Sequence, residues 1–220
     1  MQLSGEQLLD AGLTVSTPYV APIGSNAKRI RPPLFPLAPL FPFCYNDSKK
    51  GGVSMISMET AYFAGGCFWC ITPTFREMEG VMNVVSGYSG GDEVNPVYED
   101  VKSQRTGHRE SIRIDYDPAV VSFRELFEIF LNGVDPFDPD GQFIDRGHSY
   151  TLAVYYLSQE QRLIAEEGIR QLEQESGQNV CIHVEPFCSF YTAEEYHQNY
   201  DLKNPEAFQR ELIESGRKKI

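Results

Sequence analysis

The chain has 220 residues, of which 41% are hydrophobic and 23% are charged, a balance typical of a folded globular domain and unlike that of disordered or fibrous proteins. Its formal net charge of −12 disfavours nucleic acid as a partner, because most of the surface would repel a phosphate backbone. No stretch approaches the roughly 18 apolar residues of a membrane-spanning helix, so no membrane association is expected.

The five cysteines are an odd number scattered along a mid-sized chain, which is not the pattern of a secreted, disulfide-rich domain. The first residues lack the basic and apolar regions of a signal peptide. We therefore expect a cytoplasmic protein whose cysteines are reduced.

Residues 1–59 are expected to form an extended N-terminal arm, because they hold seven of the fourteen prolines. Three interpretations remain open for this arm. It is a partner-binding polyproline segment, a disordered extension, or non-native sequence upstream of a natural start at Met55 or Met58.

Residues 60–220 carry the regular patterns of a folded catalytic domain. Strands are predicted at 60–64, 81–88, 111–116, 150–157 and 180–184. Helices are predicted to begin at Cys67, after Ser122 with Glu125, after Ser158 with Gln161, and after Thr192 with Glu195. This order indicates an α+β fold with a ferredoxin-like split β-α-β sheet, packed helices and the extended arm.

The glycines before Cys67 place a thiol where a strand turns into a helix, and the helix dipole is expected to favour the thiolate there. Cys70 lies one helical turn further on, close enough to form a disulfide with Cys67 after a small rearrangement. The pair is therefore suited to cycling between dithiol and disulfide. The aromatic residues Phe68 and Trp69 between the two cysteines indicate either a pocket for a small apolar group or core packing.

Two other classes of protein also contain such a cysteine pair. A zinc-stabilised binding module would draw its remaining ligands from Cys181, His183 and Cys188, although their spacing is irregular. A general thioredoxin-like dithiol-disulfide oxidoreductase would share the two cysteines, but no thioredoxin-type strand order is evident. Elemental analysis would detect stoichiometric zinc in the binding module. A disulfide-reduction assay would detect the activity of a general dithiol oxidoreductase.

Six motifs follow one another along the chain. They are Gly-Cys-Phe-Trp at 66–69, Ser-Gly-Tyr-Ser-Gly-Gly at 86–91, Asn-Pro-Val-Tyr at 95–98, Thr-Gly-His-Arg-Glu at 106–110, Gln-Phe-Ile-Asp-Arg-Gly-His-Ser-Tyr at 142–150, and Glu-Glu-Tyr-His-Gln at 194–198. Together, over about residues 61–210, the chain resembles the class A peptide methionine sulfoxide reductases. The arm has no counterpart in the core common to that family.

The resemblance implies reduction of the S epimer of methionine sulfoxide, free or in oxidised proteins, by a thiol mechanism without metal or other cofactor. It implies Cys67 as nucleophile and Glu110 as acid. The remaining implied roles are Tyr98 and Tyr150 as hydroxyl donors to the sulfoxide oxygen, Phe68 and Trp69 as the cradle of the substrate methyl group, and Asp145 and His197 as residues lining the site.

The chemistry asks for these residue types independently, because attack on a sulfoxide sulfur requires a proton source for its oxygen. Glu110 can serve if burial raises its pKa, and two phenols aimed at the same oxygen would stabilise the developing charge. Each residue also has a structural interpretation: Glu110 as a polar strand end, Asp145 as part of a turn with Gly147, and the tyrosines and His197 as packing residues.

Loss of methionine leaves Cys67 as a sulfenic acid, which a second thiol condenses to a disulfide. The C-terminal segment contains no cysteine, so Cys70 is the leading resolving residue and Cys188 is the alternative. As in the family, thioredoxin is expected to reduce the disulfide, and a monomer is expected.

Overall fold

The computed structural model describes residues 58–217, so the interpretations of the N-terminal arm fall almost entirely outside the described residues. Within them the chain forms a curled, mixed six-stranded sheet with the order β7-β6-β1-β3-β2-β8, together with a two-stranded β4-β5 hairpin. Neighbouring strands of the large sheet are antiparallel except for β6 and β7, which are parallel. The central strands β1 and β3 are therefore paired on both sides.

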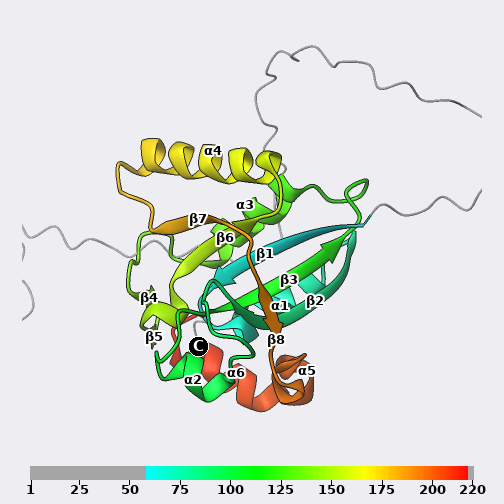
Figure 1. Cartoon of the computed structure of the whole chain (residues 1–220), viewed down its shortest axis with the longest axis vertical. Helices are drawn as coiled ribbons and strands as arrows, with labels where there is room; N and C mark the ends of the chain where they lie inside the picture. The colour runs from blue at the N-terminus through cyan, green and yellow to red at the C-terminus, as the bar shows by residue number, and fades with distance from the viewer. Residues whose placement is uncertain (1–57, 218–220) are drawn as a thin grey trace, which may run out of the picture. The chain divides into compact units, whose positions relative to one another are not determined.

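The elements, in chain order, are β1 (Glu59–Gly65), α1 (Phe68–Arg76), β2 (Val81–Ser89), α2 (Tyr98–Lys102), β3 (Arg109–Tyr116), α3 (Phe123–Gly133), β4 (Gly141–Gln142), β5 (Asp145–Arg146), the 3₁₀ turn η1 (His148–Tyr150), β6 (Leu152–Tyr156), α4 (Gln159–Ser176), β7 (Ile182–Pro186), β8 (Phe190–Thr192), the 3₁₀ turn η2 (Glu195–His197), α5 (Tyr200–Lys203) and α6 (Pro205–Glu214). In Figure 1, α4 runs above α3 and β7, whereas α2, α5 and α6 lie at the opposite end of the sheet.

The main core lies between the sheet and helices α1 and α3. Alternate residues of β3, among them Ile112 and Ile114, face this layer together with aromatic residues of the helices such as Phe75 and Phe130. Phe63 of β1 stacks on Phe130 with ring centroids 4.8 Å apart. Burial of these side chains fixes α1 against the central strands, and it thereby also fixes Cys67, the residue before α1.

The expected strands, and the helices that begin near 67, 122 and 158, are confirmed. Ser122 and Glu125 form a reciprocal capping box at the start of α3. The helix predicted to begin after Ser158 is α4, and it ends at Gly177, which has the left-handed conformation.

The expectation for the C-terminal part is wrong in one respect. Thr192 does not cap a helix, because it is the last residue of β8, which pairs with β2. The Glu195 segment forms only the turn η2, and the longer closing helix starts at Pro205. Thr192 followed by Glu195 is the pattern of a helix start, but Thr192 instead pairs with β2 at the edge of the sheet, and this tertiary interaction outweighs the local preference.

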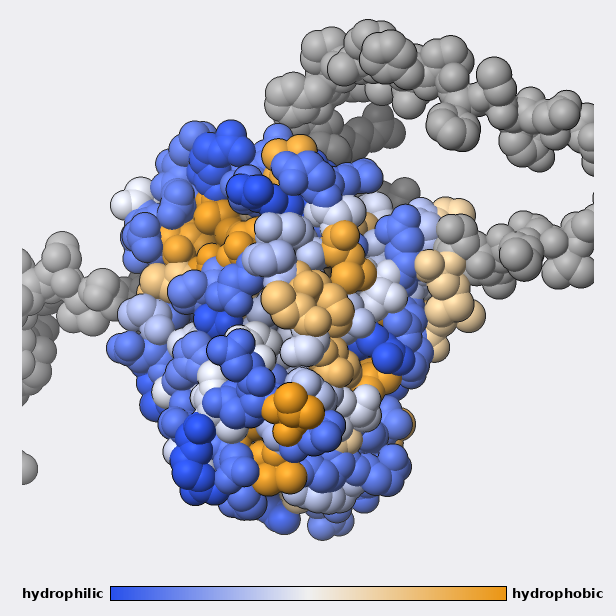
Figure 2. Space-filling view, in the orientation of Figure 1, coloured by the Kyte–Doolittle hydropathy of each residue, from blue (hydrophilic) through white to orange (hydrophobic). Residues whose placement is uncertain are grey.

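The surface seen in Figure 2 is mainly hydrophilic, with hydrophobic residues gathered below α4. A groove of about 220 Å³ between α3 and α4 includes Phe127, Leu131 and Leu172 among its lining residues. None of the helices within the described residues has the length and hydrophobicity needed to cross a membrane.

Candidate active site

Cys67 lies at the junction between β1 and α1, and it is the residue that caps α1. Gly66 turns the chain with a φ of +76°, and a β-carbon at this position would lie 2.6 Å from Cβ of Gln142. Glycine is therefore required at the turn that presents the cysteine. The Cys67 side chain is only 5% exposed, so the expected position at a helix start is confirmed, but in a buried environment.

Cys70 and Glu211 surround the sulfur of Cys67. The two sulfur atoms and a carboxylate oxygen of Glu211 all lie within 4.8 Å of one another. The Cys67 thiol donates a hydrogen bond to Oε1 of Glu211 at 3.8 Å. The structure thus brings the two predicted cysteines together and adds a carboxylate from α6.

The expectation that Cys67 is a thiolate near neutral pH is wrong for the resting protein. A hydrogen bond with Cys70, burial, and the nearby charges of Glu110 and Glu211 hold the pKa of the Cys67 thiol well above its ordinary value. The pKa of Cys70 is lowered instead, by the hydrogen bond from Cys67 and, against the effect of burial, by the charge of Arg217. The helix start alone does not overcome these effects, because the thiolate there would be both desolvated and next to negative charge.

Glu110 lies at the start of β3 on the face covered by α1, and it is only 2% exposed. Its Oε2 accepts a hydrogen bond from the backbone N–H of Phe68 at 3.1 Å, which fixes the carboxyl beside the first turn of α1. Burial, together with the charges of Asp145, Cys70 and Glu211, raises the pKa of Glu110 to about 8, although the bond from Phe68 opposes this shift. The carboxyl is therefore protonated at neutral pH, as the acid role requires.

The phenols of Tyr98 and Tyr150 belong to the same electrostatic cluster. Tyr98 begins α2, and Tyr150 ends η1, two elements that follow β2 and β5. Burial and then the charge of Glu110 raise the pKa of each phenol, and Cys67 contributes to both shifts. Both phenols keep their protons and can act as hydrogen-bond donors over a wide pH range.

Phe68, Trp69 and His197 form an aromatic group next to Cys67. Phe68 is fully buried in the main core, whereas Trp69 is half-buried and stacks on Tyr200 with ring centroids 3.7 Å apart. The indole N–H of Trp69 donates to Nδ1 of His197 at 3.1 Å. Burial lowers the pKa of His197 to about 4, so this histidine is neutral at pH 7 and acts as an acceptor that orients the indole.

Asp145 lies in β5, near Cys70 and Glu110, rather than in a turn with Gly147 alone. Its Oδ2 is buried without a hydrogen-bond partner, and burial raises the pKa of its carboxyl. An unsatisfied buried oxygen at this position leaves an acceptor free for a ligand.

Cys188 and Cys181 do not share this environment. Cys188 is exposed in the connection between β7 and β8, where its sulfur contacts the carbonyl of Pro186. Cys181 is half-buried, and its sulfur contacts the carbonyl of Phe137. Among residues 58–217, the acidic, histidine and cysteine side chains grouped closely enough for a shared metal are Cys67, Cys70 and Glu211, so the zinc ligand set proposed from sequence is not assembled.

Sequence reasoning missed three charged residues of the site. Glu211 and Arg217 follow the last motif, and nothing in their spacing distinguishes them from ordinary helix-surface charges. Arg217 lies over the ring of Phe143, at 4.4 Å from the centroid, and its charge reaches Cys70 and Asp145.

Glu194 is the third missed residue, although it stands within a quoted motif. It accepts hydrogen bonds from the Tyr88 hydroxyl at 2.7 Å and from the Tyr98 N–H at 2.9 Å. These two bonds join β2 to the start of α2, and thereby fix the backbone of Tyr98.

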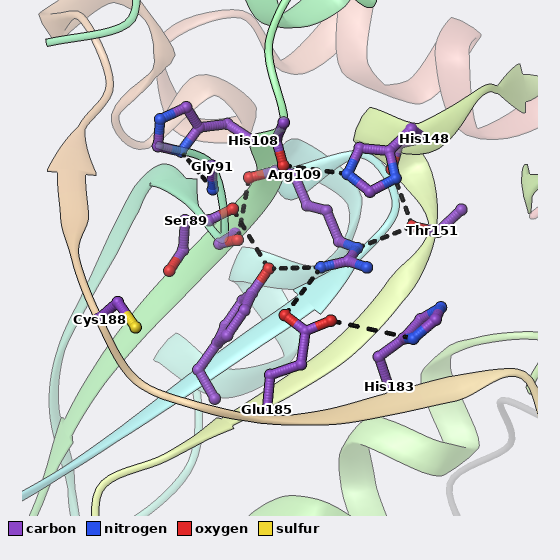
Figure 3. A network of polar contacts seen from close by, with 12 residues as sticks. Ser89, Gly91, His108, Arg109, His148, Thr151, His183, Glu185 and Cys188 are labelled. Carbon is purple, nitrogen blue, oxygen red and sulfur yellow. Dashed lines mark hydrogen bonds and ion pairs between the residues drawn. The ribbon is translucent and has the colours of Figure 1, made fainter. Parts of the chain in front are cut away.

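The opposite face of β3 is held by Arg109, the neighbour of Glu110 (Figure 3). The guanidinium donates to the Thr151 hydroxyl at 2.8 Å, the Tyr155 hydroxyl at 3.1 Å and the Glu185 carboxylate at 3.2 Å. Because Thr151 follows Tyr150 directly, this network ties the strand of Glu110 to the turn that carries a phenol of the site.

A cavity of about 430 Å³ opens on the Arg109 side, and its lining includes Arg146, His148 and His183. None of Cys67, Glu110, Tyr98 or Tyr150 lines it. The chemistry of the buried cysteine and carboxyl, rather than the size of this cavity, identifies the candidate active site.

The sequence matches the family model of the peptide methionine sulfoxide reductases over residues 59–220. A peptide methionine sulfoxide reductase MsrA of Bacillus licheniformis is 46% identical over 166 residues, which cover 72% of this chain and 89% of the relative. The protein of the same name from Halalkalibacterium halodurans is 44% identical over 163 residues, covering 73% and 92%.

The fold is also similar to solved structures of methionine sulfoxide reductases. Methionine sulfoxide reductase A of Corynebacterium diphtheriae superposes with a TM-score of 0.63 at 30% identity, over 69% of this chain and 77% of that one. Reduced Mxr1 from Saccharomyces cerevisiae superposes with a TM-score of 0.64 at 27% identity, over 68% and 87%.

Proposed function

Since this chain belongs to the peptide methionine sulfoxide reductase family and is an oxidoreductase that reduces methionine sulfoxide, we propose that Cys67 is its nucleophile, Glu110 its acid and Cys70 its resolving thiol. The proposed substrate is the S epimer of methionine sulfoxide, free or within oxidised proteins. Thioredoxin is the proposed reductant.

In the first proposed step the sulfur of Cys67 attacks the sulfoxide sulfur, and Glu110 transfers its proton to the sulfoxide oxygen. Tyr98 and Tyr150 donate hydrogen bonds to that oxygen as its negative charge grows. The oxygen then forms a bond to the Cys67 sulfur while its bond to the substrate sulfur and the new sulfur–sulfur bond both break, so that methionine leaves and Cys67 carries the hydroxyl as a sulfenic acid. The substrate is reduced by two electrons, and Cys67 is oxidised by the same two electrons.

In the second proposed step the sulfur of Cys70 attacks the sulfur of Cys67 and displaces its hydroxyl group. The hydroxyl is protonated and leaves as water, and a Cys67–Cys70 disulfide forms. The lowered pKa of Cys70 supports this role, because the attacking form is the thiolate. A dithiol partner such as thioredoxin then reduces the disulfide by thiol–disulfide exchange.

The substrate methyl group is proposed to contact Phe68 and Trp69. Stacking with Tyr200 holds one face of the indole and a hydrogen bond to His197 holds its N–H edge, which supports a rigid apolar wall. Asp145 and His197 complete the proposed lining of the site.

The observation that carries this proposal is the joint burial of Cys67 and a protonated Glu110 at the start of α1. Burial is what gives Glu110 a pKa of about 8 and makes it a proton donor at neutral pH. The most direct experiment follows reduction of the separated S and R sulfoxide epimers of N-acetylmethionine by the wild type, Cys67→Ser and Glu110→Gln.

The wild type is expected to reduce the S epimer only, Cys67→Ser to have no activity, and Glu110→Gln to be slower by a factor of about 10² or more. Full activity of Cys67→Ser would refute the assignment of the nucleophile. Equal rates on both epimers would refute the proposed substrate class.

We propose further that the enzyme acts as a monomer in the cytoplasm, and that its central sheet is of the ferredoxin-like type. The strand order β6-β1-β3-β2, with α1 after β1 and α3 after β3, supports the second statement.

A further inference from the structure

Glu211 is the residue whose contacts the proposed mechanism leaves unused. It lies in the last turn and a half of α6, 144 positions after Cys67, and its Oε1 accepts the hydrogen bond of the Cys67 thiol. The carboxyl of Glu110, by contrast, accepts a hydrogen bond from the N–H of Phe68. Two groups therefore hydrogen-bond with the Cys67 thiol, the Cys70 sulfur and the Glu211 carboxylate, and Glu211 is the one that the second step does not use as a nucleophile.

We infer that Glu211 is a second catalytic carboxylate, which removes the proton of Cys67 while Glu110 gives a proton to the sulfoxide oxygen. This inference rests on the proposed function, because it concerns the same attack by Cys67. It deepens that function by assigning the two proton transfers of the first step to two different side chains.

The need for two carboxyls follows from the state of the resting site. Cys67 holds its proton, because Cys70, burial and nearby carboxylates raise the pKa of its thiol. Glu110 also holds its proton. A protonated Glu110 cannot accept the thiol proton at the moment when it is needed as a donor, so the attack requires a separate acceptor next to Cys67.

The proton and electron balance closes with these two groups. The Cys67 thiol passes its proton to the Glu211 carboxylate as the sulfur bonds to the sulfoxide sulfur, and Glu110 passes its proton to the oxygen. Methionine leaves, Cys67 becomes a sulfenic acid, Glu211 is protonated and Glu110 is ionised. When Cys70 displaces the hydroxyl, the proton of Glu211 completes the leaving water, and the thiol proton of Cys70 restores Glu110.

The surroundings of Glu211 suit a base of this kind. The charged and titratable groups that act on it include Asp145 of β5, Cys67 at the start of α1, Arg217 after α6 and Glu214 on its own helix, and the Cys70 sulfur also lies within 4.8 Å of its carboxylate. Burial and Asp145 raise the pKa of Glu211, whereas the bond from Cys67 and the charge of Arg217 lower it. Glu211 is thus a half-buried carboxyl that is more basic than a surface glutamate, and the charge of Arg217 favours its ionised form.

The test uses Glu211→Gln and two rate measurements on the reduced, full-length protein. The first is methionine formation in a single turnover with the S epimer of N-acetylmethionine sulfoxide. The second is alkylation of Cys67 by iodoacetamide, followed by peptide mass spectrometry so that the other cysteines are not counted. Substitution removes a negative charge beside Cys67, which lowers the pKa of the thiol and increases the thiolate fraction.

If Glu211 is the base, the two rates change in opposite directions. Alkylation of Cys67 is expected to accelerate several-fold, and single-turnover reduction of the sulfoxide is expected to slow by about 10²-fold. Glu211→Asp is expected to recover part of the sulfoxide rate, because it keeps a carboxylate on α6. Glu206→Gln, at an exposed position in the first turn of the same helix, is the matched control and is expected to leave both rates unchanged.

An unchanged or faster sulfoxide rate in Glu211→Gln would overturn the inference, since the carboxylate would then only raise the pKa of the thiol. A parallel fall of both rates would also overturn it, because it would indicate a packing role. If the wild type and Glu206→Gln themselves form no methionine, the proposed function fails, and this result is distinct from a defect confined to Glu211→Gln.

Discussion

The chemistry of the site depends on a carboxylic acid that keeps its proton at pH 7. Glu110 does so because it is buried on the helix-covered face of β3, beside a fully buried Phe68 and near other acidic groups. A single hydrogen bond from the Phe68 N–H stabilises the ionised form, but not enough to offset the burial. The same burial that makes Glu110 an acid therefore works against the stability of the fold.

The raised pKa of Glu110 should make the free energy of unfolding depend on pH. Its pKa is about 8 in the folded protein, whereas an unperturbed glutamate carboxyl has a pKa of 4.5, so the folded state keeps a proton that the unfolded state has lost. Stability contributed by this group is complete below pH 4.5 and falls as the pH rises toward 8, by about 3 kcal/mol at pH 7. Urea titrations should show Glu110→Gln to be more stable than the wild type at about pH 7.5, with the difference disappearing near pH 4.5. A variant that is less stable at both pH values would contradict this explanation.

If Cys70 is the resolving thiol, its loss should leave a single turnover intact and abolish multiple turnovers. Cys70→Ser should release about one methionine per enzyme, because Cys67 and Glu110 are intact, and then stop at the sulfenic acid. Steady-state turnover with thioredoxin should be lost. Cys188→Ser is the matched control, because its sulfur is exposed and contacts Pro186 rather than the catalytic cysteine. If Cys70→Ser sustains turnover and Cys188→Ser does not, Cys188 is the resolving thiol.

Individual site residues could be predicted where they fall in motifs. Cys67, Glu110, Tyr98 and Tyr150 were found in this way, and their charges act on one another in the structure. The direction of the Cys67 pKa could not be predicted, because the sequence shows the helix start but neither its burial nor the approach of Glu211.

At the scale of elements, α3 has the clearest local signal for its own start. The Ser122 hydroxyl accepts from the Glu125 N–H, and the Glu125 carboxylate accepts from the Ser122 N–H at 2.9 Å. The helix then buries Leu126, Phe127 and Phe130 against the sheet. Local and tertiary interactions thus favour the same helix.

The capping box predicts a measurable contribution to stability. Ser122→Ala should lower the free energy of unfolding by about 1 kcal/mol, because the Glu125 N–H loses its partner, and should leave activity unchanged. Ser176→Ala, near the end of α4, removes an exposed bond to the Leu172 carbonyl and one from the Gln178 N–H, and serves as the control at a helix end. Equal stability of Ser122→Ala and the wild type, measured by thermal unfolding, would show that the box contributes nothing.

Elements with strong periodicity were predicted, and those that depend on distant pairing were not. β3 alternates clearly and lies between two strands, as its pattern indicated. β8 is three residues long and is a strand only because Phe190, Tyr191 and Thr192 pair with β2. Short segments of this kind carry too little local preference to be identified without their partner.

At the scale of the whole molecule, the site is assembled from segments that are far apart in sequence. Phe68 and Glu110 are 42 positions apart, Trp69 and His197 are 128 apart, and Cys67 and Glu211 are 144 apart. The central sheet brings the first pair together, and η2 and α6 close over the start of α1. The contribution of Glu211 could therefore emerge only from the folded chain.

The extent of the family match predicts that residues before Met58 are dispensable for catalysis. The match begins at residue 59, and the site residues all lie beyond it. A chain starting at Met58 should fold with the same thermal midpoint and keep kcat/KM for the S epimer within about twofold. A loss of activity, with retained folding, would show that the N-terminal segment takes part in the reaction.

The central claim is that a buried thiol and a protonated carboxyl act together on the sulfoxide, and that a second thiol then resolves the sulfenic acid. Its most direct test is mass spectrometry of the reduced enzyme after one equivalent of the S epimer of N-acetylmethionine sulfoxide, with proteolysis to map the product. The expected result is a loss of two hydrogen atoms and one disulfide joining Cys67 to Cys70. Recovery of an unmodified Cys67, or of a disulfide that excludes it, would contradict the account.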